Sequence, residues 1–327
     1  MTTKDNIYSI DWAVKKNIII FDGEKTKSIP PTIDAIEKFL ASFDGGKATF
    51  LFEAGGADVF KLLAFRAGHA VMQIPGRRVK ESRDSQVTEK SDENDARLLW
   101  QLWQENNGGG AMNLLPLLAN EIVPAPFYAF TEDDKNIAEL QILFREHEKL
   151  KQEIVREKNR LIAFKRRFEV AAVEDVGKIA ESAKTAIKAK EKALALIKAK
   201  LGKKLKAHKI WNGYLSKIKG IGPVIGAGLI GEIGSRQFAS PESLRHYAGM
   251  IPKSESTEFN RFLKVILYHV IEGFIKHRTP GWREKYDELK SYYASKHPDW
   301  RKGKIDSYAK KLLARIFIDD YGKKRGG

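Results

Sequence analysis

Residues 7–22 read IYSIDWAVKKNIIIFD, and this stretch decides the fold class of the N-terminal part of the chain. Its two apolar runs, rich in isoleucine and bounded by charged residues, predict a β-hairpin that ends at Asp22. Further along, ATFLFEA (48–54) and AVMQIP (70–75) predict two more strands. Because stretches with helical spacing alternate with these strands, we expect a mixed α/β sheet. The expected helices span residues 33–43, 57–67 and 91–105.

The chain of 327 residues is too long for one small core, and its composition changes twice. The run Asn106-Asn107-Gly108-Gly109-Gly110 and the prolines that follow it indicate a connection. From about 131 to 209 glycine and proline nearly vanish, and the composition predicts long helices that pair with each other or with a second subunit. We therefore expect an α/β domain over residues 1–118, a linker with coiled-coil-like helices over 119–210, and an all-helical domain over 211–327.

The chain carries 58 basic and 42 acidic residues, a formal net charge of +16. Such an excess predicts a polyanionic partner, with nucleic acid as the leading candidate; the alternative is a well-solvated surface. In residues 182–209 Glu191 is the only acid, which indicates either a solvated helical face or a spacer that also contacts phosphate. No cysteine is present, and this excludes disulfides, thiolate zinc sites and cysteine nucleophiles.

The N-terminal residues MTTKDNIYSIDWAVKK contain acids and no apolar core segment, so we expect no secretory signal. No apolar run approaches the length that spans a bilayer. These features predict a soluble cytoplasmic protein without a membrane partner, associated with the nucleoid when it is bound to DNA.

Carboxylates occupy unusual positions in the first domain. Asp11 lies within the first predicted strand, and Glu53 ends another. A carboxylate in a buried strand is costly unless it is paired or binds a cation. Asp92 and Asp95 share one face at the start of a predicted helix, where Asp92 alone would be an ordinary acid facing the helix dipole. Together the carboxylates predict a site for Mg²⁺, or for Mn²⁺ in its place.

These residues carry a family resemblance. The segments Ile10-Asp11, Phe52-Glu53-Ala54-Gly55 and Ser91-Asp92-Glu93-Asn94-Asp95-Ala96-Arg97 resemble the DEDD transposases of bridge-RNA-guided insertion sequences, a group that includes pilin-gene invertases. The resemblance implies an RNase H-like first domain with the fold of Holliday-junction resolvases, in which the four acids are catalytic and bind the metal. It also implies a prokaryotic source, a structured guide RNA as partner and work as a homo-oligomer, a dimer or a tetramer.

The C-terminal part opens on a glycine turn. The residues Ile218-Lys219-Gly220-Ile221-Gly222-Pro223 have the form of a helix-hairpin-helix, in which glycines let backbone N–H groups approach a phosphate. The alternative is a helix-packing turn, since Gly226, Gly228 and Gly231 continue at close-packing spacing. We expect DNA contacts from Lys219, Gly220, Gly222, Arg261 and Lys264.

The resemblance resumes at this turn and continues through Tyr247-Ala248-Gly249 and Ile251-Pro252. In the family a serine shortly after that proline attacks DNA, which implies Ser256 as the nucleophile here, with Ser254 as the reserve. The loop after Ser256 is shorter than the family pattern, because Thr257, Glu258 and Phe259 lead directly into the next predicted helix. The alternative role for Ser256 is an ordinary helix N-cap.

Aromatic residues interleave with lysines and arginines near the C-terminal end. They are Trp282, Tyr286, Tyr292, Tyr293 and Trp300. Such a pattern suits base stacking and phosphate contact, and it is equally common in ordinary core.

Together these features predict a site-specific DNA recombinase or transposase of a mobile element, with a Mg²⁺-binding carboxylate site, a serine nucleophile and RNA guidance implied by the resemblance. Two alternatives remain open. One is a metal-dependent, structure-specific DNA nuclease in which the carboxylates act alone. The other is a nucleic-acid-binding relative that kept the scaffold after losing the catalytic loop.

Overall fold

The computed structural model describes residues 6–12, 17–43, 45–55, 57–85, 89–107, 127–171, 176–234, 236, 238, 240–251 and 259–326. The chain forms two compact units. The N-terminal unit comprises Met1–Lys135 with Ser235–Gln237, and the C-terminal unit comprises Asn136–Gly234 with Phe238–Gly327. Within the described residues, no helix combines the length and the apolar character needed to cross a membrane.

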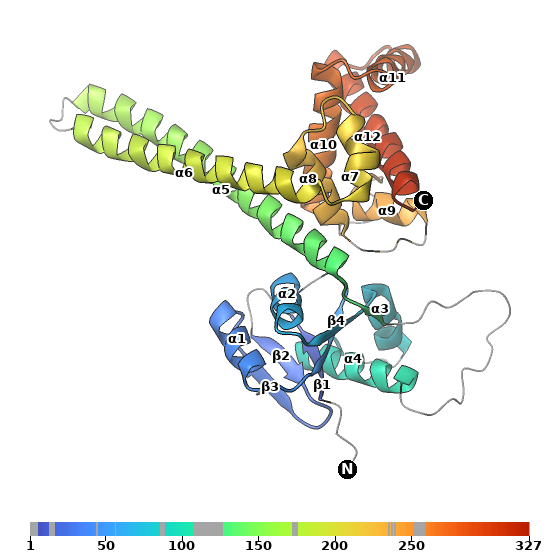
Figure 1. Cartoon of the computed structure of the whole chain (residues 1–327). Coiled ribbons are helices and arrows are strands. Elements are labelled where there is room, and N and C mark those ends of the chain that lie inside the picture. The colour runs from blue at the N-terminus through green and yellow to red at the C-terminus, as the bar shows by residue number, and fades with distance from the viewer. Residues whose placement is uncertain are drawn as a thin grey trace. The chain divides into compact units, whose positions relative to one another are not determined.

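The N-terminal unit is built on a mixed sheet of six strands in the order β3-β2-β1-β4-β5-β6 (Figure 1). The central pairs β1–β4 and β4–β5 are parallel, and β1–β2, β2–β3 and β5–β6 are antiparallel. This arrangement confirms the mixed α/β sheet that the sequence predicts. The strands are β1 (Ile7–Asp11), β2 (Ile18–Phe21), β3 (Thr26–Ile29), β4 (Thr49–Glu53), β5 (Ala70–Ile74) and β6 (Tyr128–Ala129).

Four helices accompany this sheet. They are α1 (Ile33–Ala41), α2 (Asp58–Arg66), α3 (Gly76–Ser85) and α4 (Asp92–Asn107). The first begins where Thr32 Oγ1 accepts a hydrogen bond from the Ala35 N–H at 3.3 Å, an N-cap that satisfies one free helix donor. Phe50, Phe52 and Phe60 are fully buried between sheet and helices. The strands β3 and β6 and the helix α3 are additions to the elements that the sequence predicts.

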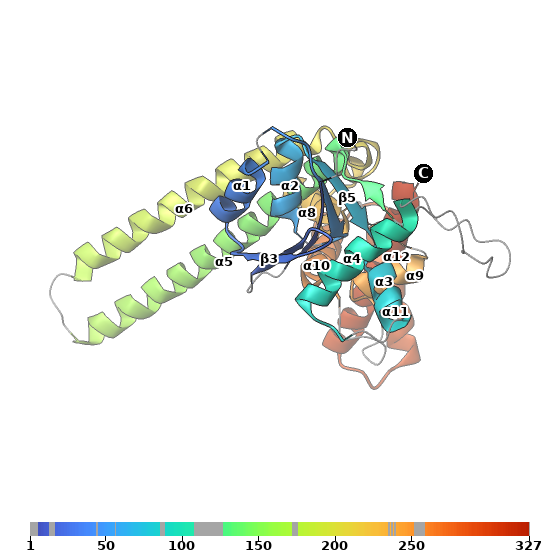
Figure 2. The ribbon, with the colours of Figure 1, turned by 90° about the horizontal axis from the view of Figure 1, so that it is seen from below.

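The C-terminal unit contains a long helical hairpin formed by α5 (Glu132–Ala171) and α6 (Val176–Leu205). The first four residues of α5 belong to the N-terminal unit. Figures 1 and 2 show the two helices antiparallel and side by side. Ion pairs join them: Lys190 Nζ lies 3.1 Å from Glu153 Oε2, and Lys158 Nζ lies 2.6 Å from Glu191 Oε1. The lysine-rich helix therefore finds acidic partners on α5, which confirms that the two predicted helices pair with each other.

The remainder of this unit is helical, as the sequence predicts. Its core combines residues of α8, α10 and α12, among them Leu229, Leu267 and Phe317, all fully buried. The most apolar helix, α8, is buried along most of its length. The elements are α7 (Lys209–Gly213), the short 3₁₀ turn η1 (Leu215–Lys217), α8 (Pro223–Ile233), α9 (Pro241–Tyr247), α10 (Arg261–Lys276), α11 (Trp282–Lys296) and α12 (Lys302–Gly326).

Candidate functional site

Two of the predicted carboxylates lie at the same edge of the sheet. Asp11 ends β1 and Glu53 ends β4, and these strands are parallel with Ile10 opposite Phe52. Asp11 and Glu53 each directly follow a residue of the Ile10–Phe52 pair, so the two acids lie at the same level of the sheet. The carboxyl ends of parallel strands are the edge at which α/β sheets place their sites.

The start of α4 brings the other two acids to this edge. Ser91 caps the helix, since its Oγ accepts from the Asn94 N–H at 3.1 Å. The buried Ser9 hydroxyl donates to the Ala96 carbonyl at 2.6 Å, which holds the first turns of α4 against β1. Both Asp92 and Asp95 are half-buried there.

The four acids act on one another electrostatically. Burial raises the pKa of the Asp11 carboxyl to about 7, and the charges of Asp95, Asp92 and Glu53 contribute in that order. The pKa of Glu53 is also raised, by desolvation first and by Asp95 next. Its carboxylate lies against the first residue of α3, where a Cβ at Gly76 would overlap Glu53 Oε1. The site concentrates negative charge at one place.

One cation partly neutralises this charge. Arg83 of α3 donates from Nε and Nη2 to Asp95 Oδ1 at 2.8 and 2.7 Å, and the exposed fraction of each side chain is 14%. Sequence analysis missed Arg83, because α3 has almost no apolar periodicity to mark it as a helix that packs on α4.

A second cation lies beneath the strand end. Lys61 of α2 is 1% exposed, and its Nζ donates to the Glu53 carbonyl and to Gln73 Oε1, each at 3.0 Å. Burial lowers the pKa of this lysine to about 8. Lys61 therefore supports the backbone that carries Glu53. A lysine inside the apolar run VFKLLAF is the sequence signal that would have revealed it.

The donors at this edge are all carboxylate oxygens, the ligand type of a hard divalent ion. The charges of the other three acids raise the pKa of Asp11, and a bound cation would lower it again. Within the described part of the chain, however, no three His, Asp or Glu side chains form a group that could hold a metal ion as arranged. Binding would require the carboxylates to converge and Asp95 to exchange Arg83 for the ion.

Replacing Asp11 by Asn should flatten the pH dependence of stability in the N-terminal unit. The folded protein keeps a proton on Asp11 up to about pH 7, whereas the unfolded chain loses it near pH 4. Wild-type stability therefore falls as the pH rises between these values, by on the order of 2–4 kcal/mol. Hydrogen exchange of β1 and β4 amides in EDTA, corrected for intrinsic rates, measures this fall. Glu37→Gln, an exposed acid of α1, should behave as wild type; an unchanged fall in Asp11→Asn would contradict the account.

The glycine turn before α8 packs tightly on α10. Gly220 has φ of +96°, and a Cβ there would meet the Gly273 backbone at 3.0 Å. The Thr279 hydroxyl donates to the Lys219 carbonyl at 2.6 Å and secures the turn. Gly222, by contrast, has open space at its Cβ position and precedes the free N–H groups of α8. Close packing on α10 therefore explains why residue 220 is glycine, whereas the space beside Gly222 is open to a phosphate.

A cavity of about 640 Å³ in this unit brings some of the predicted DNA-contacting residues together. Gly220 and Arg261 both line it, with the additional cations Lys151, Lys198 and Lys276. Lys264 points its ammonium over the Phe259 ring, 4.3 Å from the centroid.

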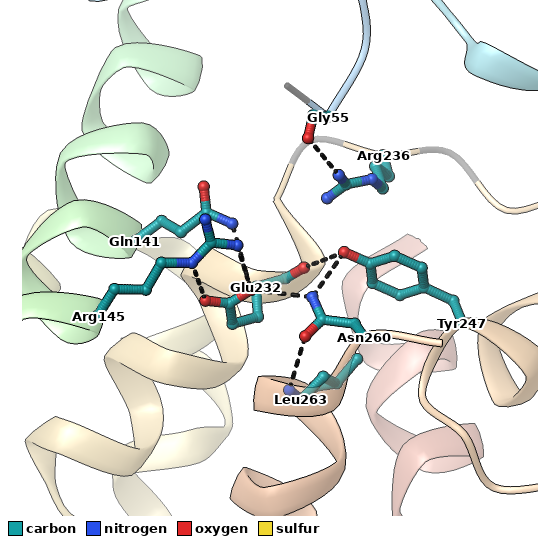
Figure 3. A network of polar contacts seen from close by, with 8 residues as sticks. All are labelled: Gly55, Gln141, Arg145, Glu232, Arg236, Tyr247, Asn260 and Leu263. Carbon is teal, nitrogen blue, oxygen red and sulfur yellow. Dashed lines mark hydrogen bonds and ion pairs between the residues drawn. The ribbon is translucent and has the colours of Figure 1, made fainter. Parts of the chain in front are cut away.

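A buried carboxylate organises the start of α10 (Figure 3). Glu232 of α8 is fully buried and accepts from Arg145 Nε and Nη2 at 2.8 and 2.9 Å. Asn260 Nδ2 donates to Glu232 Oε2 at 2.9 Å, and Asn260 Oδ1 caps α10 by accepting from the Leu263 N–H at 2.9 Å. The Tyr247 hydroxyl donates to the Glu232 carbonyl at 2.9 Å. The network thereby positions the helical turn that carries Arg261.

The predicted nucleophile Ser256 and its reserve Ser254 lie outside the described residues, within 252–258. The first described residues after this segment are Phe259 and Asn260. Sequence analysis missed the network that holds Asn260, although one signal was present: Glu232 is a lone acid within the apolar run VIGAGLIGEIG.

Two glycine variants separate packing from phosphate contact. Gly220→Ala should cost about 2–4 kcal/mol of stability, because it adds both backbone strain and a clash with α10. Gly222→Ala should leave the melting temperature unchanged, since its φ of −85° and the open space suit alanine. If the N–H groups behind Gly222 contact phosphate, this variant weakens binding of duplex DNA measured by anisotropy. Unchanged affinity in Gly222→Ala would remove that role from the turn.

Removing the partner of the buried carboxylate should destabilise the C-terminal unit. Arg145→Met leaves Glu232 without its cation and is expected to cost about 2–4 kcal/mol. The double variant with Glu232→Gln should recover at least half of this loss, because the uncompensated charge is gone. Hydrogen exchange of α8 and α10 amides in the full chain measures both. The matched control Arg156→Met, at an exposed position of α5, should change stability by less than about 0.5 kcal/mol; equal losses at both arginines would contradict the account.

Comparison with protein families adds an independent observation. Residues 212–287 are similar to the family described as Transposase IS116/IS110/IS902. The matched segment covers the glycine turn, α8, α9 and α10, and it contains Glu232, Tyr247 and Asn260 of the Glu232 network. No curated protein matches the chain. The family match supports a DNA transposase or recombinase of a mobile element.

Proposed function

We propose that this protein is a site-specific DNA recombinase of an insertion sequence in which a carboxylate site and a serine nucleophile act together. The observation that carries the proposal is the match of residues 212–287 to a transposase family in a chain whose first unit gathers four carboxylates at one sheet edge. An RNase H-like assignment of that unit is compatible with its mixed sheet. The net charge of +16 suits a nucleic-acid partner.

In this proposal Asp11, Glu53, Asp92 and Asp95 hold Mg²⁺, or Mn²⁺ in its place. The bound ion would supply positive charge beside the phosphate oxygens. Arg83 then gives up Asp95, and its positive charge becomes available to a DNA phosphate at the same edge. Lys61 keeps its bond to the Glu53 carbonyl and holds the strand end in place.

Ser256 is the proposed nucleophile, on the ground of its position after Pro252. Its Oγ forms a bond to a DNA phosphorus while one P–O bond of the same phosphodiester breaks. The serine proton is released and the departing sugar oxygen takes up a proton, so the step exchanges one ester for another. Reversal by a different DNA end completes strand exchange.

A structured RNA that selects the target and a homo-oligomeric assembly complete the proposal. The RNA follows from the family resemblance. Exposed apolar side chains along the α5–α6 hairpin, at Val155, Ile162, Ile179 and Leu196, support an oligomer formed through these helices.

The decisive experiment is detection of a covalent protein–DNA adduct. Wild-type protein, incubated with circular donor DNA and Mg²⁺, should yield an adduct at Ser256 that mass spectrometry locates. Ser256→Ala should abolish the adduct, whereas Ser254→Ala should retain it. Asp11→Ala should reduce adduct formation by more than about 100-fold, because each catalytic group contributes on that scale.

Two results would replace the proposal. Metal-dependent cleavage without any adduct, retained in Ser256→Ala, would identify a structure-specific nuclease whose carboxylates act alone. Binding of DNA or RNA with no cleavage in either Mg²⁺ or Mn²⁺ would identify a non-catalytic relative.

A further inference from the structure

The connection between α11 and α12 carries a stacked group of aromatic rings. His297 and Trp300 stack with centroids 3.9 Å apart and planes at 5°. Tyr293 is nearly parallel to Trp300 at 6.2 Å, and Tyr308 of α12 lies 4.6 Å from Trp300. A hydrogen bond from the Trp300 N–H to the His297 carbonyl at 3.0 Å closes the turn. These rings, with Tyr292, form an ordered group that we call the aromatic platform.

The fold itself uses only some of the aromatics in this region. Trp282 stacks on Phe274 with centroids 4.9 Å apart, and Tyr286 is 4% exposed within the core. Tyr292 and Tyr308, by contrast, are 49% and 44% exposed. Large rings held in water at this density are the signature of a binding surface.

Positive charge surrounds the aromatic platform. Between residues 290 and 304 the sequence places one acid, Asp299, among basic residues that are all exposed. Counting only the residues that the structure describes, no carboxylate lies within ion-pair distance of any of these basic side chains. They are Lys290, Lys296, Arg301, Lys302 and Lys304. Their charge is therefore available to an anionic partner.

Trp300 is the centre of the platform, and neighbouring rings and a lysine pack against its indole. His297 covers one side of the indole at 3.9 Å. The Tyr308 ring also packs on Trp300, with centroids 4.6 Å apart, and the Lys304 ammonium lies 4.0 Å from the centroid of the same indole. An exposed lysine over a ring is a weak, mobile cover, worth about 0.5–1 kcal/mol. A flat ligand that stacks better would displace it and keep the ammonium nearby.

We propose that the aromatic platform binds unpaired nucleotides of a nucleic acid, with one base stacked on Trp300 in place of Lys304. The displaced ammonium then pairs with the adjacent phosphate, and the exposed rings of Tyr292 and Tyr308 accept neighbouring bases. A duplex cannot use this surface in the same way, because its bases already stack on one another. An acidic peptide would satisfy the lysines and gain nothing from the parallel rings.

This inference rests on the proposed function in one respect: both take nucleic acid as the partner. It adds that single-stranded segments, of DNA or of RNA, are held by side chains of α11, α12 and their connection, which are residues of neither the carboxylate edge nor the glycine turn. Adduct formation and single-strand binding are different measurements, so failure of one is distinguishable from failure of the other.

The test measures anisotropy of fluorescein-labelled strands of about 12 nucleotides with the full-length protein. Single-stranded DNA, single-stranded RNA of the same sequence and the corresponding duplex form the three arms. Trp300→Ala should weaken single-strand binding by about 5- to 100-fold, as expected when one stacked base is lost. Trp300→Phe should retain most of the affinity, because it keeps a ring. Lys304→Met should make the fall of log affinity with log salt concentration less steep, by about the amount that one phosphate contact contributes.

Tyr268→Ala is the matched control, since Tyr268 is 37% exposed on α10 and lies outside the aromatic platform. It should bind as wild type, and all variants should melt within a few degrees of wild type. A loss in either single-stranded arm with intact duplex binding supports the proposal, and the tighter arm identifies DNA or RNA. Unchanged binding by Trp300→Ala overturns it. So does an equal loss in the duplex arm, or a Trp300→Phe variant as weak as Trp300→Ala.

Discussion

A carboxylate without access to water, that of Glu232, is the constraint around which the C-terminal unit is organised. Such an ion is tolerated only where partners replace its hydration. Two elements far apart in sequence meet that need, α5 through Arg145 and Gln141 and the start of α10 through Asn260, while Tyr247 at the end of α9 binds the Glu232 backbone carbonyl. Apolar packing is non-directional, and alone it would leave the rotation of these helices less determined. The polar network orients what the apolar core holds together.

In the N-terminal unit, by contrast, several acids lie close to one another. Parallel pairing of β1 and β4 forces Asp11 and Glu53 to one edge, and the start of α4 adds further acids. Arg83 pairs with Asp95, and Lys61 binds the Glu53 carbonyl in place of its carboxylate, yet the pKa values of Asp11 and Glu53 stay raised. Stability alone gives no reason to keep such an arrangement. Negative charge concentrated at a strand edge is the property that phosphate chemistry would use.

Most elements were predictable from the sequence because they bury apolar residues at regular spacing. The exceptions have physical reasons. Thr26–Ile29 is largely exposed and becomes a strand only by pairing with β2, while Gly76–Ser85 buries little more than Val79 and depends on tertiary contacts such as the Arg83 ion pair. The acids of the candidate site were visible because carboxylates stand out in apolar strands. Their basic partners were not, since an arginine or a lysine on a helix looks solvated until the fold supplies its neighbour.

The distribution of positive charge follows from the same distinction. The longest lysine-rich stretch is α6, yet its Lys190 and Lys204 are joined to glutamates of α5 across the helical hairpin, so these pairs add little to the field of the protein. The excess that gives the chain its net charge of +16 must therefore come from cations without such partners. The basic residues between 290 and 304 are of this kind, and they surround the aromatic platform, of which Tyr293 packs against the core while Tyr292 and Tyr308 are exposed. A run of lysines is thus a poorer guide to a nucleic-acid surface than a shorter segment whose cations form no ion pair with a carboxylate of the described residues.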